Sequence, residues 1–163
     1  MDPERVKQAR KEEIEYVHKM GLYQKVPVSE CVRATGRQPI SVRWIDINKG
    51  DNENPNYRSR LVAREINTHK REDLFAATPP LEAMKAILSL TTTANKGEVL
   101  MINDISRAFF HARVKRNVYV QLADEDKKDG EQDLCGKLQF SMYGTRDAAQ
   151  NWFEEYSSQL RSR

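Results

Sequence analysis

A strand–turn–strand pattern in the first half of the chain limits most strongly what the chain can fold into. The stretch SVRWIDIN (41–48) alternates apolar and polar residues, as a half-buried strand does. The stretch KGDNENPN (49–56) is rich in Gly, Asn, Asp and Pro, which predicts a turn. The stretch YRSRLVAREI (57–66) predicts the returning strand. Together these segments predict a β-hairpin, on which Arg58 and Arg60 share one face because strand side chains alternate.

Basic residues concentrate around this hairpin. Between Arg33 and Arg71, nine lysines and arginines face four acidic residues, so the segment carries a charge of +5 on a chain whose net charge is +3. Residues 124–133 have the opposite balance, with six acidic residues against two lysines. A basic lobe on a nearly neutral chain suits a polyanion partner. An ordinary solvated surface explains the same pattern, and charge alone favours that simpler interpretation.

Composition narrows the class of protein. The chain has 163 residues, which suits one domain, and no apolar stretch approaches the roughly 20 residues that a membrane-spanning helix needs. The charged N-terminus lacks the apolar run of a signal peptide, so we expect an intracellular protein without a membrane partner. Cys31 and Cys135 stand far apart without the spacing of a zinc or redox motif, and we expect two unpaired thiols.

Hydrophobic periodicity predicts the remaining elements. We expect helices over 4–20, 81–95 and 147–160, strands over 98–104, 117–122 and within 135–144, a short helical turn over 106–111, and a solvated loop over 123–133. The apolar stripe of the second helix consists of Leu81, Met84, Ile87, Leu88 and Thr91. The fold class is therefore α+β, in which the basic hairpin lobe precedes the opening half of a ferredoxin-like sheet. A sheet that stops there leaves an unpaired edge, which suggests that the chain ends early.

The stretch MINDISRAFFHARVKRNVYVQL (101–122) contains the main candidates for chemistry. They are Asp104 at the end of an apolar run, the aromatic residues Phe109 and Phe110, and a basic patch of Arg113, Lys115 and Arg116. A carboxylate at the tip of a buried strand costs free energy unless it meets a cation, and its oxygens suit a hard cation such as Mg²⁺. A capping or salt-bridged aspartate is the simpler interpretation. Two-metal chemistry also needs several acidic groups, so Asp104 would need partners.

Taken in order, these stretches resemble the reverse transcriptase of copia-type LTR retrotransposons. VRWIDINKGD resembles the first finger strand of that family, and NYRSRLVARE resembles its RYKARLVAKG block. Further resemblances follow in the family's order, in LFAATPPLEAMKAILSL, NDISRAFFHARVKRNVYV and LQFSMYGTRDAAQNWFEEY. The match covers nearly all of the chain. The resemblance implies a right-hand polymerase, with a fingers lobe over residues 1–78 and the first part of a palm over residues 79–163.

The resemblance implies roles for the residues around the candidate aspartate. Asp104 matches the first of the three metal-binding aspartates in the palm, which implies Mg²⁺ as the cofactor of the complete enzyme. Ile105 would line the metal site through its backbone. Phe109 matches the steric gate that excludes a ribose 2′-OH and so selects deoxynucleotides. Plain core packing is the alternative for Phe109 and Phe110, and we expect it to hold for one of the two.

Two further parts of the chain match nucleotide-binding positions of the family. Arg58 and Arg60 match finger residues that clasp the triphosphate, a role that suits permanently charged, bidentate guanidinium groups. The register does not decide between them, and a solvated cation is the alternative for both. Tyr143 and Gly144 match the turn that contacts the template and the incoming base.

Departures from the family pattern bear on activity. The Pro-Gly that follows the VYM strand is replaced by LADEDKK, and the proline of the QAPRAW motif is Ala149 here. The paired aspartates of the palm do not occur in the sequence, which stops at Arg163. We expect part of an RNA-directed DNA polymerase that is inactive alone. Its partners would be an RNA template, a DNA primer, dNTPs and the remaining polymerase and RNase H regions. The alternatives are a non-catalytic nucleic-acid-binding remnant and a translated retroelement fossil.

Overall fold

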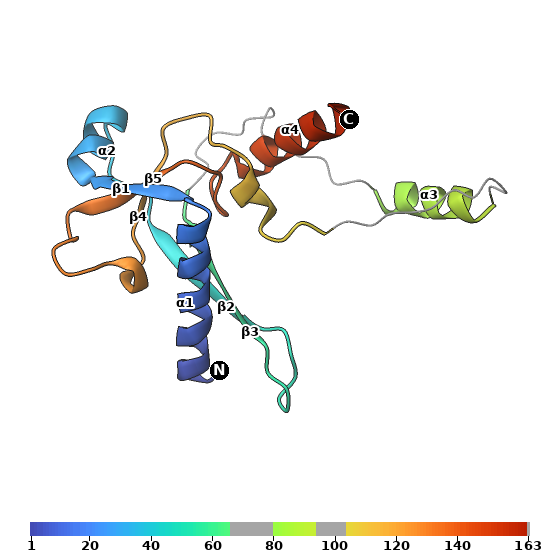
Figure 1. The fold of residues 1–163 in the computed structure, drawn as a ribbon, viewed down its shortest axis with the longest axis horizontal. Helices are drawn as coiled ribbons and strands as arrows, with labels where there is room; N and C mark the ends of the chain where they lie inside the picture. Colours follow the sequence, from blue (N-terminus) through green and yellow to red (C-terminus); the bar gives the residue numbers. More distant parts are fainter. Residues whose placement is uncertain (66–79, 94–103, 163) are drawn as a thin grey trace.

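The computed structural model describes residues 1–65, 80–93 and 104–162, which form a mixed α+β structure (Figure 1). The helices are α1 (Pro3–Lys19), α2 (Val28–Thr35), α3 (Leu81–Thr93) and α4 (Ala148–Arg161), with short 3₁₀ helices η2 (Ala108–His111) and η3 (Asp124–Asp126). The strands are β1 (Tyr23–Pro27), β2 (Val42–Asn48), β3 (Tyr57–Ala63), β4 (Tyr119–Gln121) and β5 (Leu134–Leu138). The α+β class is confirmed. Of the strand predicted over 98–104, residues 98–103 lie outside the described residues, and Asp104 belongs to no helix or strand.

The predicted hairpin is confirmed as the antiparallel pair β2–β3, in which Asn48 lies opposite Tyr57. Polar side chains at its turn form hydrogen bonds to backbone N–H groups that have no partner in the β-ladder. The Asn48 side-chain oxygen accepts hydrogen bonds from the backbone N–H groups of Gly50 and Asn56, at 3.0 and 2.8 Å. Asn48 therefore closes the turn from one strand end.

Alternation along β3 sorts its side chains between the core and the solvent. Ser59, Leu61 and Ala63 are buried, and Arg58 and Arg60 are exposed. The prediction that the two arginines share one face is confirmed, and that face is the solvent-facing one.

A three-stranded antiparallel sheet with the order β1–β5–β4 brings the two ends of the sequence together. Tyr23 of β1 lies opposite Leu138 of β5. The ring of Tyr23 covers Gly136, where an added Cβ would lie 2.8 Å from the ring. Sequence analysis did not predict β1, because its five residues bury Val26 alone and show no apolar alternation. Residues from both halves of the chain therefore share one sheet.

The main core lies between α1, the hairpin and the segments around η2 and β4. It includes Val17, Leu22, Leu61, Phe110, Val120 and Met142, each no more than 1% exposed. In Figure 1, α1 runs alongside the hairpin, and this contact buries one side of the helix. The Asp2 side chain caps the helix by accepting hydrogen bonds from the backbone N–H groups of Glu4 and Arg5.

The prediction that residues 123–133 form a solvated loop is wrong at Asp126. This residue is 4% exposed, and its carboxylate accepts a hydrogen bond from the hydroxyl of Tyr23 at 2.6 Å. It also forms an ion pair with Lys25 at 3.3 Å, and the Nε2 atom of His18 lies 2.7 Å from one of its oxygens. A buried carboxylate is tolerated here because donors from α1 and β1 surround it. The acidic composition of the loop concealed this inward-facing carboxylate.

The helix α3 is confirmed, but none of its residues is buried. Figure 1 shows α3 set apart from the sheets and the other helices. None of the described helices combines the length and the apolar character that a membrane span requires. Cys31 and Cys135 are buried and form no disulfide, as the sequence predicts, and burial raises the pKa of the Cys135 thiol to about 11.

Candidate functional site

Three of the predicted site residues meet beside β3, toward the end of the hairpin that lies away from its turn. The guanidinium of Arg60 on β3 lies over the ring of Tyr143, with 5.5 Å between the guanidinium carbon and the ring centre. The ring of Phe109 in η2 contacts the same tyrosine, at 5.0 Å between ring centres. We call Arg60, Phe109 and Tyr143 the aromatic platform. Because its members come from three separate segments, packing of the folded chain creates it.

Gly144 explains how Tyr143 reaches the hairpin. The backbone N–H of Ala63 donates a hydrogen bond to the Tyr143 carbonyl at 2.8 Å, so the turn lies directly against the end of β3. A Cβ added at Gly144 would lie 2.0 Å from the Ala63 carbonyl oxygen, and the φ angle of Gly144 is +82°. Glycine alone fits this left-handed, closely packed position. Gly144 therefore serves the platform by allowing the turn to approach the strand.

Burial changes the chemistry of the platform tyrosine. It raises the pKa of the Tyr143 phenol above its usual value, and this effect exceeds the opposite influence of Arg60. Tyr143 is therefore a neutral hydrogen-bond donor at physiological pH. The platform combines one fixed positive charge, two aromatic rings and one hydroxyl.

The two neighbouring phenylalanines have different environments. Phe110 is fully buried and belongs to the main core, where its ring also contacts Tyr143 at 5.6 Å. Phe109 is half-buried and keeps part of its ring at the surface. The expectation that one of the two is a core residue is confirmed for Phe110. Phe109 remains the residue that can meet a ligand.

Arg58 is not part of the platform. Its side chain is exposed, and its Nε donates to the side-chain oxygen of Asn56 at 3.4 Å, near the turn of the hairpin. Arg60 lies two residues further along the same face and closer to Tyr143. The geometry thus separates two arginines that the sequence could not distinguish.

Asp104 and Ile105 are both exposed and lie just before η2. Asp104 is therefore not a buried strand-end carboxylate, and the burial argument for a cation does not apply to it. Within the described residues, no group of three or more His, Cys, Asp or Glu side chains gathers where it could hold a metal ion. The carboxylate of Asp104 can supply one metal ligand, and further ligands would have to come from elsewhere.

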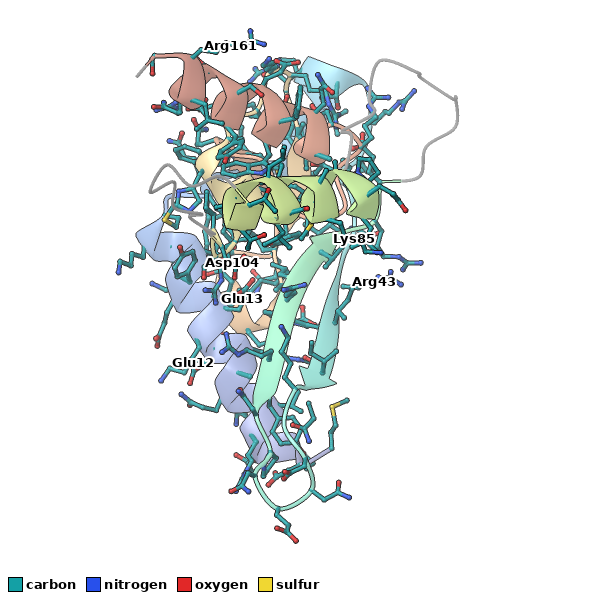
Figure 2. The ribbon with its side chains drawn as sticks, turned by 90° about the vertical axis from the view of Figure 1, so that its right-hand side faces the viewer. Glu12, Glu13, Arg43, Lys85, Asp104 and Arg161 are labelled. Atoms are coloured by element: carbon teal, nitrogen blue, oxygen red, sulfur yellow. The ribbon has the colours of Figure 1, made fainter. Side chains whose placement is uncertain are left out.

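An ion pair that sequence analysis missed fixes the segment after Asp104. The Nε of Arg107 donates a hydrogen bond to one carboxylate oxygen of Glu13 on α1 at 2.8 Å, and its Nη2 forms an ion pair with the same oxygen at 2.7 Å. The Arg107 guanidinium also lies 4.0 Å from the ring centre of Tyr16. Glu13 is 1% exposed, and its second oxygen has no partner among the described residues. Figure 2 shows where Glu13 and Asp104 lie relative to the hairpin. Arg107 has a positive φ angle of +50°, so the chain bends at this residue, between Asp104 and η2.

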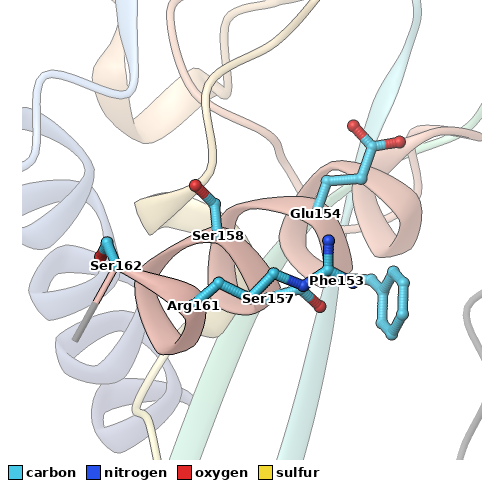
Figure 3. Close-up of a pocket in the computed structure, with 6 residues that line it drawn as sticks. All are labelled: Phe153, Glu154, Ser157, Ser158, Arg161 and Ser162. Atoms are coloured by element: carbon cyan, nitrogen blue, oxygen red, sulfur yellow. The ribbon is translucent and has the colours of Figure 1, made fainter.

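A hollow of about 510 Å³ follows the exposed face of α4 (Figure 3). Its lining residues are Phe153, Glu154, Ser157, Ser158, Arg161 and Ser162. All of them belong to a single helix or its C-cap, and none is a predicted site residue. This hollow is therefore separate from the aromatic platform.

Comparison with known proteins identifies the family. The family model described as "Reverse transcriptase (RNA-dependent DNA polymerase)" matches residues 28–163. This match covers most of the chain, which therefore belongs to that family of reverse transcriptases. The resemblance to copia-type elements is supported by a relative from Nicotiana tabacum, "Retrovirus-related Pol polyprotein from transposon TNT 1-94". It is 26% identical over 159 residues, an alignment that covers 94% of this chain and 11% of the relative. No solved structure matches the chain.

Proposed function

We propose that this chain provides the fingers and the first part of the palm of an RNA-directed DNA polymerase. Residues 1–78 would form the fingers lobe and residues 79–163 the palm portion of one domain. The complete, intracellular enzyme would extend a DNA primer on an RNA template with dNTPs. The family assignment supports this proposal. The observation that carries it is the aromatic platform, where Arg60, Phe109 and Tyr143 converge from three segments.

The platform gives each of its residues a distinct role. Arg60 would bind the triphosphate, because a guanidinium forms bidentate bonds to phosphate oxygens and keeps its charge. Phe109 would occupy the space of a ribose 2′-OH and thereby exclude ribonucleotides. Tyr143 and Gly144 would contact the incoming base and the template. Arg58, nearer the hairpin turn, would contact the triphosphate less directly.

The metal chemistry of the proposed enzyme would involve Asp104 as one ligand of Mg²⁺, with the backbone of Ile105 beside it. Mg²⁺ bound there would supply charge stabilisation for the primer 3′-OH and for the leaving pyrophosphate. The described residues offer no cluster of three ligands. We therefore propose that the other ligands come from the rest of the polymerase and that the chain alone does not extend a primer.

Nucleotide cross-linking tests the platform directly. Labelled dTTP would be photo-cross-linked to the 163-residue chain in the presence of poly(rA)/oligo(dT). Arg60→Gln should remove most of the cross-link, whereas Arg58→Gln, on the same face of the same strand, should weaken it much less. In Phe109→Ala, unlabelled rUTP should compete more strongly than in the unaltered chain. If Arg60→Gln and Arg58→Gln were cross-linked to dTTP to the same extent, the assignment of Arg60 as the main triphosphate contact would be contradicted.

Primer extension tests the proposed division of the active site. We expect no extension by the chain alone. Extension that disappears in Asp104→Asn would show that the chain carries a complete site and would overturn that part of the proposal. Salt-sensitive binding of the RNA–DNA hybrid without any dTTP cross-link would instead favour the non-catalytic nucleic-acid-binding function.

A further inference from the structure

The basic patch of the sequence lies in a connection that the aromatic platform does not use. Residues 113–117, RVKRN, link η2 to β4. Arg113 is exposed, and its guanidinium lies over the ring of Phe140 at 5.0 Å. Arg113 and Phe140 also form an antiparallel bridge, which holds the backbone of the connection against Phe140. Within the described part of the chain, the Arg113 side chain forms no ion pair and is open to a ligand.

Two adjoining cavities run along this connection. The first has a volume of about 370 Å³, and its polar lining consists of Arg113, Lys115, Arg116, Asn117, Lys137 and Gln139. The second, of about 540 Å³, shares Arg116 and Asn117 with the first. It adds Arg37, Gln38, Arg64 and Arg146, which come from three other segments. The two cavities are therefore neighbours that share Arg116 and Asn117 in their linings.

Seven cations line the two cavities, and we call them the basic band. They are Arg37, Arg64, Arg113, Lys115, Arg116, Lys137 and Arg146. The carboxylates that pair with them in the described residues are Glu30, Glu65, Asp147 and Glu154. Seven positive charges against four negative ones leave an excess of three. The band is thus only partly neutralised.

The central part of the band is rigid. Arg116 donates to Glu65 at 2.6 Å and to Asp147 at 2.8 Å, and the backbone N–H of Arg146 donates to Glu65 at 2.9 Å. These bonds hold the connection, the end of β3 and the start of α4 together. The unneutralised cations therefore project from a fixed frame, which lowers the entropic cost of ordering them around a ligand.

We propose that the basic band is a second nucleic-acid contact, which binds the sugar–phosphate backbone of a single strand. The proposal rests on the proposed function for its choice of nucleic acid as the polyanion. Five of the seven cations are arginines, whose planar donor forks match phosphate oxygens. The amides of Gln38, Asn117 and Gln139 add neutral donors between the charges. Cations spread over two neighbouring cavities suit a row of phosphates better than one isolated anion. None of the platform residues lines either cavity.

Salt-dependent binding tests the band without requiring catalysis. The affinity of the 163-residue chain for a fluorescent single-stranded RNA would be measured by anisotropy over a range of salt concentrations. Arg113→Gln combined with Arg64→Gln removes two exposed cations of the band that none of the four carboxylates pairs with. Each phosphate contact to a single strand contributes about 0.7 to the slope of log affinity against log salt, so the slope should become shallower by about 1.4. The matched control is Lys7→Gln with Lys11→Gln, two exposed lysines on α1, which should leave the slope nearly unchanged.

Three outcomes would overturn the proposal. The two double variants could weaken binding equally, which would indicate a general effect of net charge. The Arg64 and Arg113 variant could keep the original slope, which would show that the band makes no phosphate contact. Polyglutamate at equal charge could compete as well as RNA, which would point to an acidic protein. The loss of dTTP cross-linking expected in Arg60→Gln depends on the platform and not on the band. Failure of the band and failure of the platform are therefore distinguishable.

Discussion

The helices α1 and α3 were predicted from the same kind of sequence pattern, yet their surroundings differ completely. On α1, Ile14 is 7% exposed and Val17 is 1% exposed, because the helix packs against β3 and the main core. On α3, Ile87 is 51% exposed, and no residue of the helix is buried. An apolar stripe therefore predicts that a helix forms and which side it would bury. It does not specify the surface that covers that side.

The difference lies in residues far away in the sequence. The partners of α1 include Leu61 in β3 and Phe110 in η2, and its inward-facing carboxylate, Glu13, is held by Arg107. No comparable partner reaches α3 among the described residues. The stability of the described structure should therefore depend strongly on contacts of α1 and hardly at all on the stripe of α3.

Removing the partner of the buried carboxylate should have the largest effect. In Arg107→Ala, Glu13 stays buried without a counter-charge, which typically destabilises a protein by about 3–5 kcal/mol. The free energy of unfolding, measured by urea titration near neutral pH, should fall by an amount in this range. Hydrogen exchange of the backbone amides of η2 should accelerate as well, because the pair joins η2 to α1.

A second substitution separates the charge from the lost contact. Adding Glu13→Gln to Arg107→Ala removes the unpaired negative charge, so the double variant should recover a large part of the lost stability. A loss below about 1 kcal/mol in Arg107→Ala would contradict the assignment, because it would mean that Glu13 is solvated.

Acid should weaken the ion pair between Asp147 and Arg116. The expected loss of stability is smaller than that for the pair of Glu13 and Arg107. Burial raises the pKa of Asp147, but the hydrogen bonds and charge of Arg116 act in the opposite direction and hold that pKa below its usual value. A group with a lowered folded-state pKa stabilises the fold above its unfolded pKa, about 3.9 for aspartate, and loses this contribution as the pH falls through the folded-state pKa. We expect Asp147→Asn to cost about 1.5–3 kcal/mol near neutral pH, as the loss of a hydrogen bond to a charged group does.

The pH dependence provides the control for that variant. The difference in unfolding free energy between the unaltered chain and Asp147→Asn should shrink as the pH falls below about 4, because protonation then removes the same charge. A difference that stays constant down to acid pH would show that Asp147 stabilises the fold through contacts other than its charge.

The sequence predicted the elements whose stabilising interactions are local. The hairpin β2–β3 follows from alternation and turn residues, and α1, α3 and α4 follow from periodicity, whereas the eight-residue helix α2 was not predicted. The strand β1 was missed because it buries Val26 alone and gains its place by pairing with β5, more than a hundred residues later. A five-residue strand defined by such a distant partner gives little local signal.

The same distinction applies to the candidate site. Arg60, Phe109, Tyr143 and Gly144 could be named from the family resemblance, but their convergence depends on the close approach of Gly144 to β3. Glu13 was missed, although it lies four residues after Ala9 and four before Val17, on the buried side of α1. A charged residue at that helical spacing was the signal that a buried ion pair exists. The identity of Arg107 as its partner needed the folded chain.

The smallest expected effect provides the sharpest test of the comparison between α1 and α3. Ile14→Ala and Ile87→Ala make the same chemical change in two helices. Ile14→Ala leaves a cavity in the core and should destabilise the chain by about 2–5 kcal/mol. Ile87→Ala removes an exposed side chain and replaces a β-branched residue by a better helix former, so its effect should stay within about 0.5 kcal/mol. Both values would come from urea unfolding monitored by circular dichroism. A loss of more than about 1 kcal/mol in Ile87→Ala would mean that the stripe of α3 packs against another surface in solution.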